Sequence, residues 1–321
     1  MTEQLYAPEG SLIRRAENRE YISSLQGLER AMNEGRILES TALLCDSEMR
    51  LYVDLYGIRG IIERDEVLFC RRGEEPKDIA IITRVGKPIC FKVLGFTRVN
   101  GETVARLSRR AAQLECQRNY LSLLTPGDII PATVTHMESF GAFLDVGCGL
   151  SSLLSVDTIS ISRISHPSDR LRVGESVHAV VKSVDRPRER LFLSMRELLG
   201  TWEENAARFR AGQTVAGIVR SVESYGVFVE LSPNLAGLAE LREGESDRGI
   251  ATVGQYAAVY IKSILPERMK IKLVLIDSYK GEPPREELRY YIDCKQITHL
   301  DRWQYSPMGA HKVVETIFED L

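Results

Sequence analysis

Two segments of this 321-residue chain repeat one another, and the repeat constrains the fold more than any other feature. The stretch PGDIIPATVTHMESFGAFLDV matches AGQTVAGIVRSVESYGVFVEL, so Phe140 and Tyr225 occupy the same place. Each stretch begins with a glycine turn at Gly127 or Gly212. It then runs through alternating β-branched residues and enters an aromatic-Gly-x-Phe segment. The separation is too long for a solenoid repeat and indicates a duplicated small domain.

Later strands repeat as well, and a fainter third copy lies upstream. VGESVHAVVKSV matches VGQYAAVYIKSI, and DRPRERLFLSM matches LPERMKIKLVL. In the upstream copy, residues 51–55 alternate between apolar and polar, and Met49 and Tyr52 fall where Phe140 and Phe143 fall in the middle copy. Each copy has about five short strands in roughly 70 residues, which predicts a five-stranded OB-fold barrel.

Between the copies the apolar period changes to one typical of helices. Good helix formers without internal proline fill Leu107–Leu124 and Ser194–Phe209, and Asn18–Gly35 ends in a glycine helix stop. After KGEPPREE, which begins at Lys280, the tail predicts one strand and then a terminal helix after Pro307. The predicted fold class is mainly β: three tandem five-stranded OB-fold barrels joined by short helices, plus a small α/β C-terminal tail.

Composition argues against several functional classes. Lys and Arg number 42 and Asp and Glu 45, for a net charge of −3, so any nucleic-acid site must be a local basic patch. The six cysteines are scattered without a C-x-x-C pair, and the histidines are equally dispersed, which argues against a metal site, a disulfide scaffold or a catalytic cluster. We see no signal peptide and no membrane-spanning run. These features predict a cytoplasmic, non-enzymatic protein without a cofactor.

The paired rings suggest how the repeated segment works. In a plain strand, Phe140 and Phe143 would point to opposite faces. A bend at Gly141 would turn both rings outward, and small Ala142 would leave the neighbouring position open. Stacking a base on such a ring contributes about 1–3 kcal/mol and tolerates any sequence. We therefore interpret the segment as a stacking platform for single-stranded nucleic acid.

A basic turn accompanies the rings in the middle copy. In VDRPRERLFL, Arg186, Arg188 and Arg190 crowd one turn and the start of the last strand. Arginine presents a planar fork to phosphates and also stacks on bases. Asp185 can orient an arginine or accept a hydrogen bond from a base or ribose.

On these stretches the chain resembles the S1 domain family of RNA-binding OB-folds. The resemblance is strong in the middle copy, clear in the third, weak in the first and absent from the tail. It implies the following division of the chain: 1–34, N-terminal arm and helix; 35–112, degenerate S1-type domain; 113–124, linker helix; 125–197, S1 domain; 198–210, linker helix; 211–278, S1-type domain; 279–321, C-terminal extension.

The family binds RNA with two aromatics, a histidine, an aspartate and a basic residue. In the middle copy these places hold Phe140, Phe143, Ser155, Asp185 and Arg190, so Ser155 departs from the usual histidine.

The outer copies depart further from the family pattern. In the third copy the five places hold Tyr225, Phe228, Glu240, Leu265 and Lys270, so an acid replaces the histidine and leucine replaces the aspartate.

In the first copy, Met49, Tyr52 and Glu63 stand at the first three places. Acidic substitutions repel phosphate, so weak RNA binding is expected outside the middle copy. The resemblance implies that the first domain of such proteins can dock on protein.

The predicted function is non-catalytic binding of single-stranded RNA, with mRNA held near the small ribosomal subunit. The first domain is the expected docking element, and no membrane or small-molecule substrate is expected. Two alternatives stay open: a protein-interaction scaffold with residual RNA affinity, and an accessory factor in RNA decay or transcription.

Overall fold

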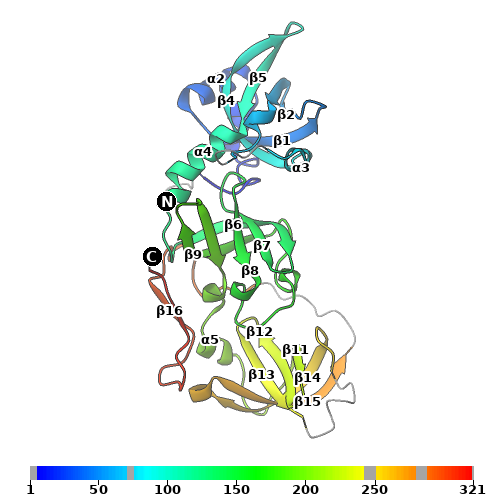
Figure 1. Ribbon diagram of the computed structural model, residues 1–321, viewed down its shortest axis with the longest axis vertical. Helices are drawn as coiled ribbons and strands as arrows, with labels where there is room; N and C mark the ends of the chain where they lie inside the picture. Colours follow the sequence, from blue (N-terminus) through cyan, green and yellow to red (C-terminus); the bar gives the residue numbers. More distant parts are fainter. Residues whose placement is uncertain (1–5, 71–75, 242–250, 280–287, 320–321) are drawn as a thin grey trace. The chain divides into compact units, whose positions relative to one another are not determined.

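The computed structural model describes residues 6–70, 76–241, 251–279 and 288–319. Within these ranges the chain is mainly β, with three five-stranded sheets that each close on themselves and one two-stranded sheet (Figure 1). The prediction of three five-stranded OB-fold barrels is therefore confirmed. The predicted break at 280–287 lies outside the described residues.

The three barrels share one strand order. The first contains β1 (Leu38–Cys45), β2 (Leu51–Leu55), β3 (Ile58–Ile62), β4 (Pro88–Val99) and β5 (Glu102–Ser108). The middle contains β6 (Ile129–Glu138), β7 (Gly141–Asp145), β8 (Ser151–Ser155), β9 (Ser176–Asp185) and β10 (Arg190–Ser194). The third contains β11 (Thr214–Glu223), β12 (Gly226–Ser232), β13 (Leu235–Glu240), β14 (Tyr256–Leu265) and β15 (Lys270–Tyr279). In each, the third and fifth strands pair in parallel and the first strand lies between the second and fourth.

Alternation along the strands decides which side chains fill each barrel. In β2, Leu51, Val53 and Leu55 are buried and join the core of the first barrel. In β12, Val227 and Val229 are fully buried in the core of the third. Burying an aliphatic side chain stabilises the fold by about 1.5–3 kcal/mol, so the register of each strand is fixed by its apolar face.

The chain packs as two compact units. The first comprises residues 1–124 together with 131–133 and 144–152, and the second comprises the remainder. The middle barrel contributes segments to both units, whereas the third barrel and the tail belong wholly to the second.

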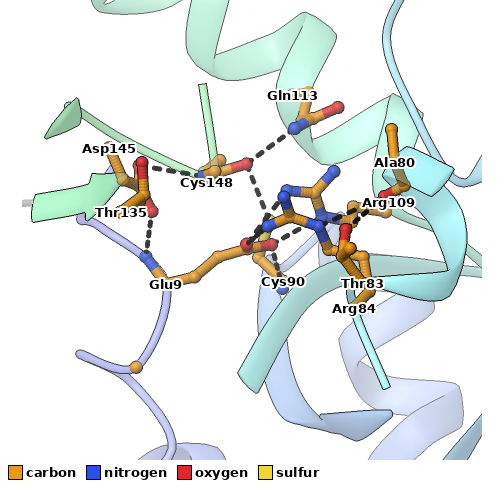
Figure 2. A network of polar contacts seen from close by, with 12 residues as sticks. Glu9, Ala80, Thr83, Arg84, Cys90, Arg109, Gln113, Thr135, Asp145 and Cys148 are labelled. Atoms are coloured by element: carbon orange, nitrogen blue, oxygen red, sulfur yellow. Dashed lines mark hydrogen bonds and ion pairs between the residues drawn. The ribbon is translucent and has the colours of Figure 1, made fainter. Parts of the chain in front are cut away.

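A buried polar network organises the first unit (Figure 2). Arg109 is fully buried and donates to both carboxylate oxygens of Glu9, at 2.6 and 2.9 Å. The backbone N–H of Glu9 donates to Asp145 at 2.8 Å, and those of Gly147 and Gly149 donate to the same carboxylate at 2.9 and 3.0 Å. A Cβ at Gly149 would lie 1.9 Å from an Arg109 nitrogen, so only glycine fits there. The network fastens the N-terminal segment to the end of β7.

The described residues of the first unit form four α-helices: α1 (Ala16–Ile22), α2 (Leu25–Glu34), α3 (Asp78–Ile82) and α4 (Arg109–Asn119). The helix predicted over 18–35 is divided, because the Ser24 hydroxyl accepts the Gly27 N–H and caps a new helix. The second of these helices, α2, ends at Gly35, which has φ +65°, as predicted. No helix in the described part of the chain is both long and apolar enough to cross a bilayer.

The connecting helix predicted over Ser194–Phe209 is present but shorter than predicted. A 3₁₀ turn, η5 (Arg196–Leu199), and a short helix, α5 (Trp202–Ala206), are separated at Gly200, whose φ is +86°. Thr201 then caps α5 in a capping box with Glu204.

The described tail forms a two-stranded sheet of β16 (Arg302–Gln304) and β17 (Glu315–Ile317). The helix predicted after Pro307 is therefore wrong within residues 308–319. Gly309 turns the chain at φ +79°, and the β-branched pair Val313–Val314 and Thr316 favour extended backbone.

Candidate nucleic-acid interface

The first ring of the middle barrel lies in a turn. Ser139 and Phe140 form the turn between β6 and β7, and Gly141 is the first residue of β7. The predicted bend inside a strand at Gly141 is therefore wrong. Glycine is needed there because a Cβ would lie 2.5 Å from the carbonyl oxygen of Leu154 in the neighbouring strand β8. Close packing of β7 on β8 thus places the turn that carries Phe140.

Both rings nevertheless point away from the core. Phe140 is 54% exposed, and Phe143 is half-buried between Ala142 and Leu144, which are fully buried. The outward orientation of the two rings is confirmed. Ala142 faces the barrel interior, however, so its predicted role of leaving space outside is wrong; its small size fits the core instead.

A third ring joins these two. The imidazole of His136, on β6, stacks on Phe143 with ring centroids 6.1 Å apart and planes 22° apart. Phe140 meets Phe143 edge-on at 6.0 Å and 89°. Glu138 contacts the exposed His136 ring at 2.6 Å. His136 was not predicted from the sequence, because its contact with Phe143 joins two different strands.

Strand β10 adds a fourth aromatic side chain. Leu191 and Leu193 are buried, so Arg190 and Phe192 share the outer face of the strand. Phe192 is 37% exposed and pairs with Leu153 of β8. The alternation of apolar residues in RLFLS predicts an outward Phe192, a residue absent from the predicted site.

Because β7, β8 and β10 are neighbours, their outward side chains cover one continuous surface. Ser155, at the end of β8, is half-buried on the same side of that strand as Leu153. We call the rings of His136, Phe140, Phe143 and Phe192 the outer aromatic face.

The basic turn follows β9. Asp185 accepts hydrogen bonds from the Arg188 backbone at 3.1 Å and from its guanidinium at 3.0 Å. These bonds lower the pKa of Asp185, chiefly through the Arg188 side chain. Arg190 pairs with Asp185 across the β9–β10 hairpin, and Arg186 is exposed in the turn. Asp185 therefore orients an arginine, and Arg190 stands on the strand that carries Phe192.

The third barrel repeats the turn and the ring pair. Tyr225 is 57% exposed, and its ring meets that of Phe228 edge-on at 6.2 Å and 89°. A Cβ at Gly226 would lie 2.7 Å from the carbonyl oxygen of Ala239, so the same close packing places this turn.

Charge distinguishes the third barrel from the middle one. Lys272 pairs with Leu238 across β13 and β15, the place that Phe192 occupies opposite Leu153. Its ammonium group lies 3.4 Å from the carboxylate of Glu240.

The remaining predicted residues of the third barrel lie at the next hairpin. Lys270 is exposed and pairs with half-buried Leu265, where the middle barrel pairs Arg190 with Asp185.

The first barrel has no comparable ring pair within its described residues. Met49 adopts φ +61°, and the Tyr52 hydroxyl donates to Asp46 at 3.1 Å. Glu63 is exposed. The outward surface of the first barrel instead presents the apolar side chains of Leu43 and Leu44.

Across the parts of the chain that the structure describes, no three His, Cys, Asp or Glu side chains gather in a way that could hold a metal ion. All six cysteines are free thiols.

The chain is similar in sequence to a known domain family and to several bacterial ribosomal proteins. The S1 RNA binding domain family matches residues 123–196, which contain the middle barrel. The small ribosomal subunit protein bS1 homolog of Bacillus cereus is 29% identical over 253 residues, covering 75% of this chain and 63% of that protein. Small ribosomal subunit protein bS1 of Staphylococcus epidermidis is 32% identical over 213 residues, covering 63% and 53%.

The chain thus spans about half to two thirds of the length of these relatives. Among solved structures, a multidomain protein with nucleic acid binding domains from Streptococcus pneumoniae aligns with 75% of this chain and 73% of its own, at 14% identity and a TM-score of 0.23.

Proposed function

We propose, from the premise that this chain is an S1 RNA-binding domain protein and a distant homologue of bacterial bS1, that it holds single-stranded mRNA near the small ribosomal subunit. The binding is non-catalytic and takes place in the cytoplasm. The observation that carries the proposal is the outer aromatic face, which lies within the matched residues 123–196. Rings that stack bases without reading their edges suit a protein that holds many different messages.

In this proposal the middle barrel provides most of the affinity. Bases stack on Phe140, Phe143 and the neighbouring rings, while Arg186, Arg188 and Arg190 contact phosphates. Asp185 holds Arg188 in place through its two hydrogen bonds. Ser155 contributes at most a hydrogen bond.

The third barrel acts as a weaker second site through Tyr225, Phe228 and Lys270. Tandem modules raise the effective local concentration of RNA, so a weak second site still prolongs binding.

Docking to the small ribosomal subunit is assigned to the first barrel. Leu43 and Leu44 are 55% and 47% exposed on neighbouring positions of β1, and an apolar surface of this kind favours protein contact over RNA contact. RNA binding and ribosome docking would then lie on different barrels.

A titration with unstructured RNA at several salt concentrations tests the binding mode. Stacking with phosphate contacts gives a log–log salt slope of about 0.7 per contacted phosphate. Arg190→Gln should lower the slope by about one such contact, whereas Arg210→Gln, an exposed arginine outside the proposed face, should leave it unchanged. An absence of binding at low salt would reject the RNA-holding function.

A second candidate, the protein-interaction scaffold with residual RNA affinity, is favoured by the Glu240–Lys272 ion pair on the third barrel. Fractionation of cell extract separates the candidates. Co-migration with small ribosomal subunits that depends on Leu43 and Leu44 supports the translation role. Co-migration with a nuclease or polymerase instead supports an accessory role in RNA decay or transcription.

A further inference from the structure

A cavity of about 550 Å³ lies in the second unit and is lined in part by β11 and β12 of the third barrel, but not by Tyr225 or Phe228. Cavities of roughly 300–1,000 Å³ are the usual size for small-molecule sites. Its lining contains five arginines and two carboxylates, an excess of three positive charges in a chain whose net charge is −3. The cavity is therefore an electropositive site in an otherwise slightly acidic protein. Its charged residues are Asp169, Arg170, Arg172, Arg208, Arg220, Glu230 and Arg289.

Both carboxylates are already engaged. Glu230 accepts from Arg170 at 2.5 Å and from Arg220 at 2.7 Å, and all three side chains are nine-tenths buried or more. Arg220 also reaches Asp169 at 3.1 Å. The ion pairs of the two lining carboxylates are thus made with Arg170 and Arg220.

Two buried polar atoms of lining residues lack partners among the described residues: Nε of Arg170 and the hydroxyl of Tyr291. Burial lowers the pKa of Arg170, and the nearby charge of Arg220 adds to this effect despite Glu230. The guanidinium is thus incompletely compensated. Buried polar groups without partners are rare in folded proteins, so both atoms remain available for a hydrogen bond at this cavity.

Tyr291 is held firmly at the cavity. Its backbone N–H donates to Leu198 at 2.9 Å, and a Cβ at Gly200 would lie 2.7 Å from its ring. The guanidinium of Arg289 lies 5.1 Å from the ring centroid. The glycine at 200 therefore both ends η5 and makes room for an aromatic ring in the lining.

Three arginines, Arg172, Arg208 and Arg289, are exposed and have no carboxylate within salt-bridge distance in the described ranges. A guanidinium matches the oxygen geometry of a phosphate with two parallel hydrogen bonds. Tyr256 and Tyr291 add aromatic surface to the same lining. Cationic forks beside aromatic rings fit a phosphorylated nucleotide better than a simple anion.

We propose that this cavity binds the phosphate of a nucleotide, with Arg172, Arg208 and Arg289 as phosphate ligands and the Tyr291 ring beside the nucleoside. The site is separate from the outer aromatic face. The nucleotide is either free or the 5′-phosphorylated end of an RNA, because both present the same group.

Calorimetric titration of the full chain with ADP tests the proposal. ADP should bind, and the triple variant Arg172→Gln/Arg208→Gln/Arg289→Gln should lose about tenfold in affinity for each phosphate contact removed. Two controls, Arg210→Gln and Phe140→Ala/Phe143→Ala, should bind ADP like the wild type. Circular dichroism checks that each variant is folded.

Competition identifies the source of the nucleotide. Displacement of ADP by a 5′-phosphorylated oligoribonucleotide, but not by its 5′-hydroxyl counterpart, assigns the site to RNA ends; displacement by neither assigns it to free nucleotides. Three results overturn the proposal: no ADP binding, equal ADP affinity in the triple variant, or inorganic phosphate binding as tightly as ADP. Because the Phe140→Ala/Phe143→Ala variant is included, loss of the aromatic face is distinguishable from loss of this site.

Discussion

The middle and third barrels share a strand order, a glycine-dependent turn and an edge-on ring pair, yet their outer surfaces differ in chemistry. The middle barrel extends its pair with His136 and Phe192. The third has Lys272 at the place of Phe192, paired with Glu240. Buried positions preserve the barrel, while outward positions are free to change. The residues that fix the fold therefore alternate, along the same strands, with the residues to which we assign RNA binding.

Removing the two rings of the middle barrel should have the largest effect on RNA binding. Phe140→Ala/Phe143→Ala should weaken binding of unstructured RNA by about 2–6 kcal/mol, since two stacking rings are lost. The fold should survive because both rings lie outside the core. Fluorescence anisotropy gives the affinity and circular dichroism the fold. Tyr225→Ala/Phe228→Ala is the matched control and should cost less; a larger loss from that control would reverse the ranking of the barrels.

A single substitution on β10 should have the next largest effect. Phe192→Ala should lower RNA affinity by about 1–3 kcal/mol if the ring stacks one base. Lys272→Ala, at the matched place, should change affinity by about 1 kcal/mol or less, because its ammonium is engaged in an exposed ion pair. Both variants are measured by the same anisotropy titration. An equal loss of affinity in Phe192→Ala and Lys272→Ala would mean that Phe192 stacks no base and does not belong to the RNA-binding surface.

The two barrels also differ in how they hold a buried carboxylate near the end of the second strand. Glu230 contacts two arginines, whereas Asp145 accepts backbone N–H groups and lies near Glu9. Burial, and next the charge of Glu9, raise the pKa of Asp145 to about 7 from an ordinary value of 3.8. Burial alone would raise the pKa of Glu9 as well, but the charge and hydrogen bonds of Arg109 lower the pKa of Glu9 below its usual value.

The raised pKa of Asp145 determines how the stability of the fold changes with pH. The folded state keeps a proton that the unfolded chain has lost, so stability falls as pH rises from about 4 towards 7. Asp145→Asn retains an acceptor oxygen but does not titrate. Between pH 5 and pH 7, the free energy of unfolding of the wild type should fall by about 2 kcal/mol relative to the variant. Urea denaturation followed by circular dichroism measures the free energy of unfolding at each pH. The same pH dependence in the wild type and in Asp145→Asn would show that the pKa of Asp145 is not raised in the folded protein.

The smallest predicted effect is a gain. Glu240→Gln frees Lys272 and removes a charge that repels phosphate, so the third barrel should bind RNA more tightly by about 0.5–1 kcal/mol. The measurement is cleanest in the Phe140→Ala/Phe143→Ala background, where the middle face contributes little. An unchanged affinity would show that Leu265, which stands at the place of Asp185, limits RNA binding by the third barrel, and that Glu240 does not.

Much of the fold could be predicted because period and glycine placement are local signals. The repeat around Phe140 and Tyr225 gave the barrels, and Gly35 ended a helix as expected. The tail helix failed because β-branched Val313 and Val314 outweighed its apparent helical period. The connecting helix is shorter than predicted because the chain turns at Gly200, where φ is +86° and a Cβ would lie 2.7 Å from the Tyr291 ring.

The candidate site was predicted only in part, for a geometric reason. Contacts within one turn, such as Asp185 with Arg188, follow from sequence spacing. Contacts between strands, such as His136 with Phe143, depend on register, which a single sequence does not determine. The pairing of Arg109 with Glu9 is more distant still in sequence and left no local signal.

Ultraviolet crosslinking of unstructured RNA to the full chain, read by mass spectrometry, tests the central claim most directly. The account predicts that the most abundant crosslinked peptides carry Phe140, Phe143 or Phe192, and that crosslinks at Tyr225 are fewer. Crosslinks absent from the outer aromatic face and concentrated instead on the first or third barrel would contradict it.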